Sequence, residues 1–443
     1  MIVESNPIRR VDPAVYELAL REAKKQVEQI RLIPSENYAS SAVLEALSTP
    51  FANKYSEGYP GENKRYYEGQ EFIDQVEMLA IERAKTLFGA DHANVQPYSG
   101  SPANLAVYFA LLKPGDRIMG LDLPSGGHLT HGSRVSITGT YYESHSYRGG
   151  PDGWLDYDQI RKQALEVRPR LIIAGATAYP RLWDFEALGR IAREVDAYFV
   201  ADIAHINGLI IGKVHPDPMP HADVVTSTTH KILRGPRGGL ILCHDEPVKG
   251  TSAEEAEKRG NRLPGRIDRA VFPGLQGGPH ENQIAALAVA LEEASRPEYT
   301  AYAEQVVKNA KALAEGLLER GFHLVTGGTD NHLLLIDMVK GKGIPGWRFA
   351  RVLYEAGIET NKNSVPDDPM TAMWASGLRI GSPAVTTRGM KEAEMAQIAR
   401  WIGEVADAMK GEEVLKPDVI ARVRGEVLEL TGSGRFPVPG IEW

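Results

Sequence analysis

The N-terminal part of the chain alternates apolar and polar positions with the period of a helix. Asp12-Pro13 is typical of a helix start, because aspartate caps helices and proline is tolerated in the first turn. Residues 72–88 predict a second long helix, and the Gly-, Pro- and Tyr-rich segment 55–69 predicts a loop before it. Behind Asp12-Pro13 an apolar line recurs at helical spacing: Val15, Ala19, Ala23, Val27 and Ile30.

From about residue 93 the pattern changes to short apolar runs separated by helical segments, of which 184–195 is the clearest. Strands that alternate with helices predict βαβ units and a mostly parallel sheet covered by helices. Ligands then lie beyond the carboxyl ends of the strands. The candidate strands are 117–121, 170–174, 198–201, 224–226 and 240–243.

A second region follows the Gly/Pro-rich stretch 273–279. A long helical segment over 283–315 leads to a strand at 332–339, a helix at 347–357 and a further strand at 378–380. The sequence therefore predicts a large α/β domain followed by a smaller one. We expect an N-terminal helical arm (1–52), a large domain (53–290) and a small C-terminal domain (291–443).

Composition narrows the functional classes without naming one. A chain of 443 residues with 43% hydrophobic residues can bury a large core, and a net charge of −8 argues against nucleic acid as a partner. No apolar run approaches the ~18 residues of a membrane span, and residues 1–10 lack the apolar core of a secretion signal. Cys243, the single cysteine, lies in an apolar run and indicates a buried strand residue. We expect a cytoplasmic protein with no membrane or nucleic-acid partner.

A candidate anion site lies where Ser99, Gly100 and Ser101 precede an apolar helical segment at 103–112. Unpaired N–H groups and the positive end of the helix dipole favour a phosphate there. Alone, such a segment is more often a simple helix cap, and it matches neither a P-loop nor a dinucleotide-binding motif. Its value depends on the residues that follow.

Asp202 and Lys231 each follow a candidate strand, 29 residues apart. Parallel strands deliver both side chains to one edge of the sheet, where the Ser99–Ser101 segment also lies. A pyridoxal-phosphate site needs an amine, a carboxylate for the pyridine nitrogen and an anion cradle. Either residue alone would more often be a cap or a surface lysine. Together with the cradle they predict a pyridoxal-phosphate site with the cofactor on Lys231.

Residues 226–239, Thr-Ser-Thr-Thr-His-Lys-Ile-Leu-Arg-Gly-Pro-Arg-Gly-Gly, closely resemble the cofactor-lysine signature of serine hydroxymethyltransferases. The resemblance runs nearly end to end and implies a pyridoxal-phosphate-dependent transferase of fold type I. Further segments that carry it are 32–37, 55–61, 126–132, 202–205, 272–279 and 361–366.

The resemblance implies a role for each residue of the cofactor site. Lys231 forms the internal aldimine, Asp202 pairs with the pyridine nitrogen, and His128 stacks on the ring. His205 and Thr177 lie near the phenolic oxygen, and Tyr55 also belongs to the cofactor set, while Thr228 and His230 join the catalytic residues. The phosphate is bound by Ser99, Gly100 and Ser101, and by Gly277 and Gly278 of a neighbouring subunit. The implied unit is a homodimer with shared sites, whose pairing into tetramers stays open.

The resemblance also implies how the substrates bind. Arg379 anchors the substrate carboxylate with help from Ser35, since a guanidinium pairs bidentately with a carboxylate, and Tyr67 is a further substrate contact. Glu57 is the acid–base residue, and a pocket closed by tyrosines would raise its pKa. The implied reaction is reversible transfer of the L-serine hydroxymethyl group to tetrahydrofolate, which gives glycine and 5,10-methylene-tetrahydrofolate. The implied folate contacts are Glu57, Tyr66, Leu123, Gly127, Leu129 and Asn363.

Several positions depart from the family pattern. Glu62, Asn63 and Lys64 lengthen the loop before Arg65, Glu68 replaces a usual glycine, Thr177 a usual serine, and Asn207 a serine or alanine. The altered loop motivates rival activities on the same scaffold, namely α-methylserine hydroxymethyl transfer or cleavage of threonine or allo-threonine.

Three further readings have less support. Gly341 to Gly346 match the GxGxxG pattern of nicotinamide dehydrogenases, but only about 100 residues follow, so we predict a strand-to-helix turn. His128 and His131 could bind a metal, yet no HExxH motif or cysteine cluster accompanies them, and we expect none. A non-catalytic binding protein or nucleic-acid regulator would not need Lys231, Asp202, Glu57 and Arg379 together.

Overall fold

The computed structural model describes residues 7–62 and 64–441, so Asn63 of the lengthened loop lies outside the described residues. Contacts divide the chain into one unit of residues 42–303 and another that joins 1–41 to 304–443. The boundary at 303/304 falls inside a single helix, α13 (Pro297–Leu318). The three-part division with boundaries after residues 52 and 290 stays a prediction.

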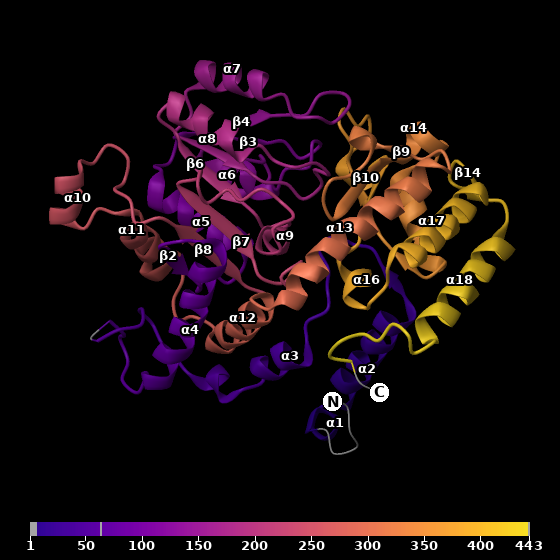
Figure 1. The fold of residues 1–443 in the computed structure, drawn as a ribbon, viewed down its shortest axis with the longest axis horizontal. Helices are drawn as coiled ribbons and strands as arrows, with labels where there is room; N and C mark the ends of the chain where they lie inside the picture. The colour runs from indigo at the N-terminus through magenta and orange to yellow at the C-terminus, as the bar shows by residue number, and fades with distance from the viewer. Residues whose placement is uncertain (1–6, 63, 442–443) are drawn as a thin grey trace. The chain divides into compact units, whose positions relative to one another are not determined.

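The unit of residues 42–303 is built on a seven-stranded sheet with the order β2-β8-β7-β6-β5-β3-β4 (Figure 1). Pairing is parallel from β7 to β4, while β8 is antiparallel to both of its neighbours. The predicted mostly parallel α/β sheet is therefore confirmed. Its strands are β2 (His92–Asn94), β3 (Arg117–Leu121), β4 (Glu143–Tyr147), β5 (Leu171–Ala174), β6 (Tyr198–Asp202), β7 (Val224–Thr228) and β8 (Gly239–Cys243).

Helices cover this sheet because its central strands are apolar on both sides. Ile173, Val200 and Val224 point to one face and form a core with α5 (Gly100–Leu111). Ile172, Phe199 and Val225 alternate with them and are also buried. The other helices of the unit are α3 (Ser41–Leu47), η1 (Pro50–Asn53), α4 (Glu71–Phe88), η2 (Leu129–His131), α6 (Ile137–Tyr141), α7 (Tyr157–Val167), α8 (Phe185–Glu194), α9 (Asn207–Ile211), α10 (Ala253–Arg259), α11 (Leu263–Arg269), η3 (Ala270–Leu275) and α12 (Glu281–Ala294).

The second unit contains a four-stranded antiparallel sheet, β12-β13-β10-β9, and a parallel pair, β1 with β11. Its first long helix starts as predicted, because the Asp12 side chain accepts the Val15 N–H at 3.1 Å. Its strands are β1 (Ile30–Arg31), β9 (His323–Leu324), β10 (Leu333–Asp337), β11 (Ile358–Glu359), β12 (Asn361–Asn363), β13 (Gly377–Gly381), β14 (Met409–Lys410) and β15 (Glu413–Val414). Its helices are α1 (Pro7–Val11), α2 (Pro13–Glu28), η4 (Val325–Gly327), α14 (Met338–Lys342), α15 (Gly346–Glu355), η5 (Ala372–Trp374), α16 (Pro383–Thr387), α17 (Glu392–Asp407) and α18 (Pro417–Gly432).

Two sequence predictions need correction. The helical segment 283–315 is not continuous, since α12 ends at Ala294 and α13 begins at Pro297, whose missing N–H suits the first position of a new helix. The Gly341–Gly346 segment is not a simple strand-to-helix turn either. The short helix α14 follows β10, and Gly343, at a φ of 66°, ends it before α15.

The structure bears on two further sequence expectations. Cys243 is buried in β8, as predicted. Within 7–62 and 64–441, every helix is too short or too polar to cross a membrane.

Candidate active site

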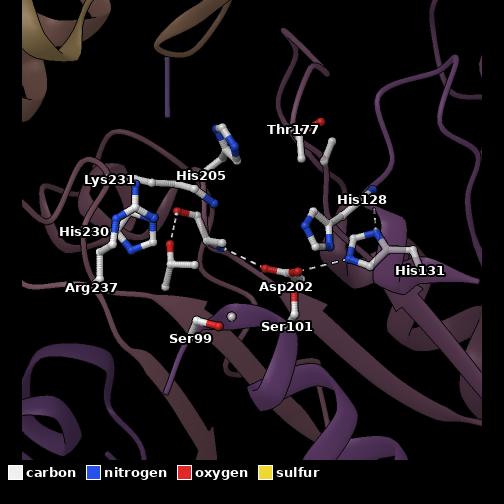
Figure 2. A pocket seen from close by; sticks show the side chains of 14 residues that line it. Ser99, Ser101, His128, His131, Thr177, Asp202, His205, His230, Lys231 and Arg237 are labelled. Atoms are coloured by element: carbon white, nitrogen blue, oxygen red, sulfur yellow. Dashed lines mark hydrogen bonds and ion pairs between the residues drawn. The ribbon is translucent and has the colours of Figure 1, made fainter. Parts of the chain in front are cut away.

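A cavity of about 250 Å³ opens at the carboxyl ends of the parallel strands of the 42–303 unit. Figure 2 shows His128 and His131 on one side of it, Lys231, His205, His230 and Arg237 on the other, and Asp202 between them. The chain thus brings together residues as far apart in the sequence as Ser99 and Arg237. The predicted site residues that line the cavity are Ser99, Gly100, Ser101, His128, Thr177, Asp202, His205, Thr228, His230 and Lys231.

Asp202, at the end of β6, is held as a carboxylate by donors from three segments. Its Oδ2 accepts the Asn104 amide at 2.9 Å and the His131 Nε2–H at 3.0 Å, and its Oδ1 accepts the Ala204 N–H at 3.0 Å. Burial alone would raise its pKa, but the hydrogen bonds from His131 and Asn104 hold the pKa of Asp202 well below its usual range. The carboxylate therefore stays ionised at neutral pH.

His128 takes part in the same network and is neutral because it is buried. His131 Nδ1 accepts the His128 N–H at 3.3 Å, which assigns the His131 proton to the Nε2 that faces Asp202. Thr130 Oγ1 accepts the Asn104 amide at 2.8 Å, so its own proton points to His128 Nδ1 at 2.7 Å. Burial lowers the pKa of His128 to about 4. The chain therefore presents an uncharged imidazole to the cavity.

Ligand atoms of His128, His131 and Asp202 lie within 4.8 Å of one another, a spacing that a metal ion could use. In the described structure, however, these atoms already take part in the hydrogen-bond network. The sequence prediction that the protein uses no metal stays a prediction.

The anion cradle is the start of α5. The Ser99 hydroxyl makes no capping bond to that helix in the described residues, and Ser101 lines the same cavity. A Cβ on Gly100 would lie 2.7 Å from the Thr228 methyl carbon, so only glycine lets β7 approach this closely. The N–H groups at the start of α5 and two hydroxyls therefore lie at the end of the strand that leads to Lys231.

Hydrogen bonds from Asn207 hold the end of β7, just before the turn that carries Lys231. Asn207 is one of the positions that depart from the family pattern. Asn207 is buried, and its amide donates to Ser227 Oγ at 2.9 Å and to the Thr228 carbonyl at 2.8 Å. Neighbouring His230 is neutral, because burial, followed by the charges of Lys231 and Arg237, lowers its pKa to about 3. Figure 2 shows the Lys231 side chain extending into the cavity.

These residues fit pyridoxal phosphate. Lys231 supplies the amine, the ionised Asp202 can pair with a protonated ring nitrogen, and the start of α5 can bind a phosphate. The neutral His128 can face an aromatic ring without placing a positive charge on it. Thr177, whose hydroxyl donates to the Gly126 carbonyl at 3.2 Å, and buried His205 also line the cavity.

A second group of predicted residues does not line this cavity in the single chain. We call Tyr55, Glu57, Tyr66, Tyr67, Gly277 and Gly278 the tyrosine cluster. Tyr67 packs edge-on against Tyr55 and Tyr66, with ring centroids 5.3 and 5.2 Å away. Tyr55, Tyr66 and Tyr67 are 58%, 80% and 40% exposed, so the chain by itself does not close the pocket expected around Glu57.

The glycine pair belongs to the tyrosine cluster by close contact. A Cβ on Gly277 would lie 3.3 Å from the Glu57 carboxylate, and one on Gly278 would lie 3.3 Å from the Tyr55 ring. Glu57 and Tyr55 therefore rest directly on this stretch of backbone.

The predicted folate residues Leu123, Gly127 and Leu129 surround His128 on the loop after β3. Leu123 lines a second cavity, of about 380 Å³, whose wall includes His128 and His131. Gly127 allows a tight turn, since its N–H donates to the Asp122 carbonyl at 2.7 Å and a Cβ would collide with Leu121. Leu123 and Leu129, which precede and follow the histidine in the sequence, are exposed.

The remaining predicted residues lie in the other unit. Arg379, in β13, is buried and donates from Nε to Asn361 Oδ1 at 3.1 Å. Burial lowers its pKa to about 10, so it stays charged at neutral pH. Asn363, in β12, pairs with Gly377, which lies in β13 like Arg379. Ser35 follows Pro34 in the sequence, and Pro34 packs against Gly381 of β13.

Sequence reasoning missed Asn104, and it assigned no role to His131 and Arg237. Asn104 is a buried amide one turn into an otherwise apolar helix, and that pattern was a usable signal. Arg237 lies in the lysine signature itself and lines the cavity. Only the folded structure shows that Asn104 and His131 both reach Asp202.

Comparisons with known proteins agree with one another. The sequence model of the serine hydroxymethyltransferase family matches residues 8–402. A serine hydroxymethyltransferase of Acidothermus cellulolyticus is 56% identical over 433 residues, which are 97% of this chain and 96% of that protein. Serine hydroxymethyltransferase 2 of Mesorhizobium japonicum is 54% identical, and the enzyme of Desulfotalea psychrophila 52%, each over 98% of this chain and 96% of the relative.

Proposed function

The chain belongs to the serine hydroxymethyltransferase family, and we propose that it transfers the hydroxymethyl group of L-serine reversibly to tetrahydrofolate. The products are glycine and 5,10-methylene-tetrahydrofolate. The observation that carries the proposal is the placement of Lys231, an ionised Asp202 and the start of α5 around one cavity.

Pyridoxal phosphate, the cofactor of this family, supplies an electron-withdrawing ring that stabilises negative charge on the Cα of the amino acid. Lys231 binds it through its amine, and Ser99, Gly100 and Ser101 bind its phosphate. The ionised Asp202 would keep a proton on the ring nitrogen, and the neutral His128 would face the ring. His131 and Asn104 restrict the orientation of the Asp202 carboxylate through their hydrogen bonds to Oδ2.

Arg379 and Glu57 act on the amino acid. The Arg379 guanidinium pairs bidentately with the substrate carboxylate, supported by Ser35. Glu57 holds the proton that moves to or from the serine hydroxyl oxygen. Leu123, Leu129 and Tyr66 provide apolar surface for the pterin, with Asn363 as a polar contact.

The packing of the tyrosine cluster supports a homodimer with shared sites. By resemblance to the family, Gly277 and Gly278 would reach the phosphate in the neighbouring subunit. Because Glu57 and Tyr55 rest on those glycines, they reach the neighbour's site together with them. We place this dimer in the cytoplasm and leave its pairing into tetramers open.

A substrate panel tests the activity. Turnover of L-serine, α-methylserine and allo-threonine is compared with and without tetrahydrofolate, alongside the visible absorption of the bound cofactor. We expect serine turnover to require tetrahydrofolate and to exceed α-methylserine turnover. Serine turnover that ignores tetrahydrofolate would overturn the proposal.

Two variants provide the controls. Lys231→Ala should lose both the absorption band and the activity. Lys162→Ala, which alters an exposed lysine of α7, should keep both. A colourless wild-type protein after incubation with pyridoxal phosphate would exclude the cofactor assignment.

A further inference from the structure

A buried charged cluster lies beneath the loop that carries Glu57. It joins Ser56 and Arg65 of the loop to Asp74 and Glu77 of α4 and to Glu281 at the start of α12. Glu77 and Glu281 are each 1% exposed, and the Arg65 side chain is 4% exposed. None of these groups lines the cofactor cavity, so the roles proposed above leave the cluster unexplained.

The cluster contains one cation for three carboxyl groups. Arg65 pairs with Glu77 at 2.6 Å and with Asp74 at 2.9 Å. Its distance to Glu281 is longer, 3.9 Å from Nη1 to Oε1. Gln96 donates to the second oxygen of Glu77 at 2.8 Å, so both Glu77 oxygens have donors. Arg65 and Gln96 thus compensate Glu77 far better than Glu281.

Glu281 is the carboxyl group that this arrangement leaves short of donors. Its Oε1 accepts a short hydrogen bond from Ser56 Oγ, whereas its Oε2 is buried and has no hydrogen-bond partner among the described residues. A buried carboxylate without donors is costly, and its neutral form is favoured. Burial, followed by the charge of Glu77, raises the pKa of Glu281 to about 7.

Arg65 also holds the backbone on both sides of Glu57. Its Nη1 donates to the Ser56 carbonyl at 2.8 Å and to the Gly58 carbonyl at 3.1 Å. The same nitrogen faces Glu281. An ionised Glu281 would therefore compete with the two carbonyls for Nη1, and a neutral Glu281 would not.

We propose that Glu281 is a positioning residue that holds a proton and thereby keeps Arg65 on the loop that presents Glu57. Loss of that proton draws Arg65 towards α12 and loosens the loop. The charged groups that face Glu281 are Arg65 from the loop and Asp74 and Glu77 from α4, and η1, which also packs on α12, has no ionisable side chain. The consequence for catalysis rests on the proposed role of Glu57.

Stability of the cofactor-free full chain tests whether Glu281 holds the proton. The unfolding midpoint in urea is compared for the wild type, Glu281→Gln and Glu292→Gln between pH 4 and 9. Glu292 lies on the same helix and forms a surface pair with Arg83, so it is the matched control. Because the folded pKa is raised, the wild type should lose stability relative to Glu281→Gln as pH rises from about 4.5 to about 7. Above pH 7 the difference should be constant.

Hydrogen exchange of the amides in residues 55–62 and 64–67 tests the loop. After correction for intrinsic rates, wild-type protection should fall several-fold between pH 6 and 8, whereas Glu281→Gln should keep its protection. Ser56→Ala removes a hydrogen bond that lowers the pKa of Glu281, so it should move the transition to higher pH. This second variant keeps the test decisive if Glu281→Gln folds poorly.

The activity profile completes the test. In the cofactor-loaded enzyme, the alkaline fall in kcat for serine should be shallower in Glu281→Gln than in the wild type and in Glu292→Gln. The proposal would be overturned if the stability difference between the wild type and Glu281→Gln did not change with pH and if loop exchange in the two proteins were the same at every pH. Unchanged kcat profiles in spite of altered exchange would overturn the link to Glu57. If the wild type lacks hydroxymethyl transfer but shows Glu281-dependent loop exchange, the proposed function is wrong and the proposed role of Glu281 in the loop still holds.

Discussion

The cofactor cavity and the tyrosine cluster differ in how far one chain completes them. In the cavity, Asp202, Asn104 and His131 satisfy one another at 2.9–3.0 Å, and the charge states follow from that network. In the tyrosine cluster, the rings of Tyr55 and Tyr66 are exposed and Glu57 has no closed pocket. The difference fits the proposed dimer, in which one chain supplies most of the cofactor site and the loop that carries Glu57 serves the site of its neighbour.

The largest expected effect concerns the completed region. Asp202→Asn removes the negative charge that keeps the ring nitrogen protonated, and kcat should fall about a thousandfold, the range seen when a preorganised electrostatic contact is lost. Steady-state kinetics at saturating pyridoxal phosphate measures it. Asp158→Asn, an exposed change on α7, is the control. A decrease in kcat of less than tenfold would show that the carboxylate does not control protonation of the ring nitrogen.

The lowered pKa of Asp202 also predicts how the stability of the protein depends on pH. Its folded pKa is depressed, so the stability that it contributes is present above the ordinary aspartate pKa of 3.8 and is lost as pH falls below that value. The urea-unfolding difference between the wild type and Asp202→Asn should therefore be constant near neutrality and change below about pH 4. A difference that changes between pH 6 and 8 would contradict this assignment.

The next prediction tests whether the second region serves a partner. Glu57→Gln alone should lower kcat by about 10²-fold, the contribution of a general acid–base residue. Mixing Lys231→Ala chains with Glu57→Gln chains creates mixed dimers in which one site has both residues intact. Random exchange should restore about a quarter of the wild-type activity.

The mixing experiment has a simple negative outcome. If Glu57 acts in its own chain, no mixed dimer contains an intact site and mixing restores nothing. Each variant mixed with itself under the same exchange conditions is the control.

A smaller effect is expected from the residues that hold Asp202. His131→Phe removes one donor and leaves Asn104, so the affinity for pyridoxal phosphate should fall roughly tenfold, as the loss of one bond to a charged group implies. Equilibrium titration of the cofactor-free protein measures it. The control His145→Phe, which changes a histidine at the surface of β4, should leave the affinity unaltered.

The smallest effect is expected at Thr177. Thr177→Ser keeps the hydroxyl that donates to Gly126 and removes only a methyl group. Activity with serine should stay within about twofold, because volume changes of one methyl group at a partly open site are tolerated. A large gain for α-methylserine relative to serine would show that the methyl group sets amino-acid preference.

Features of the fold that leave a pattern of apolar residues could be predicted from the sequence, and features without such a pattern could not. The central strands were predictable because they are continuous apolar runs, whereas β4 (Glu143–Tyr147) is polar and carries no such pattern. Lys231, Asp202 and Ser99–Ser101 were predictable as neighbours because parallel strands end at one edge. The break before Pro297 was visible in the sequence but was outweighed by the apolar periodicity on both sides.

Relations that depend on tertiary contact could not be predicted in the same way. Nothing in the sequence near Asn104 and His131 shows that both reach Asp202, since they lie 98 and 71 positions away. The buried group of Arg65, Glu77 and Glu281 joins three separate elements, and each residue alone is typical of a solvated surface. The separation of the predicted site residues into a cavity and an exposed cluster likewise required coordinates.

Cys243 has a practical consequence. The thiol is buried in β8, and burial, followed by nearby carboxylates, raises its pKa above the ordinary value, so alkylating reagents meet neither a thiolate nor an accessible sulfur. Thiol reagents should therefore leave the natural protein unlabelled. A fluorophore on a cysteine introduced at exposed Lys64 would be the sole probe in the molecule, and it would report movements of the Glu57 loop in real time.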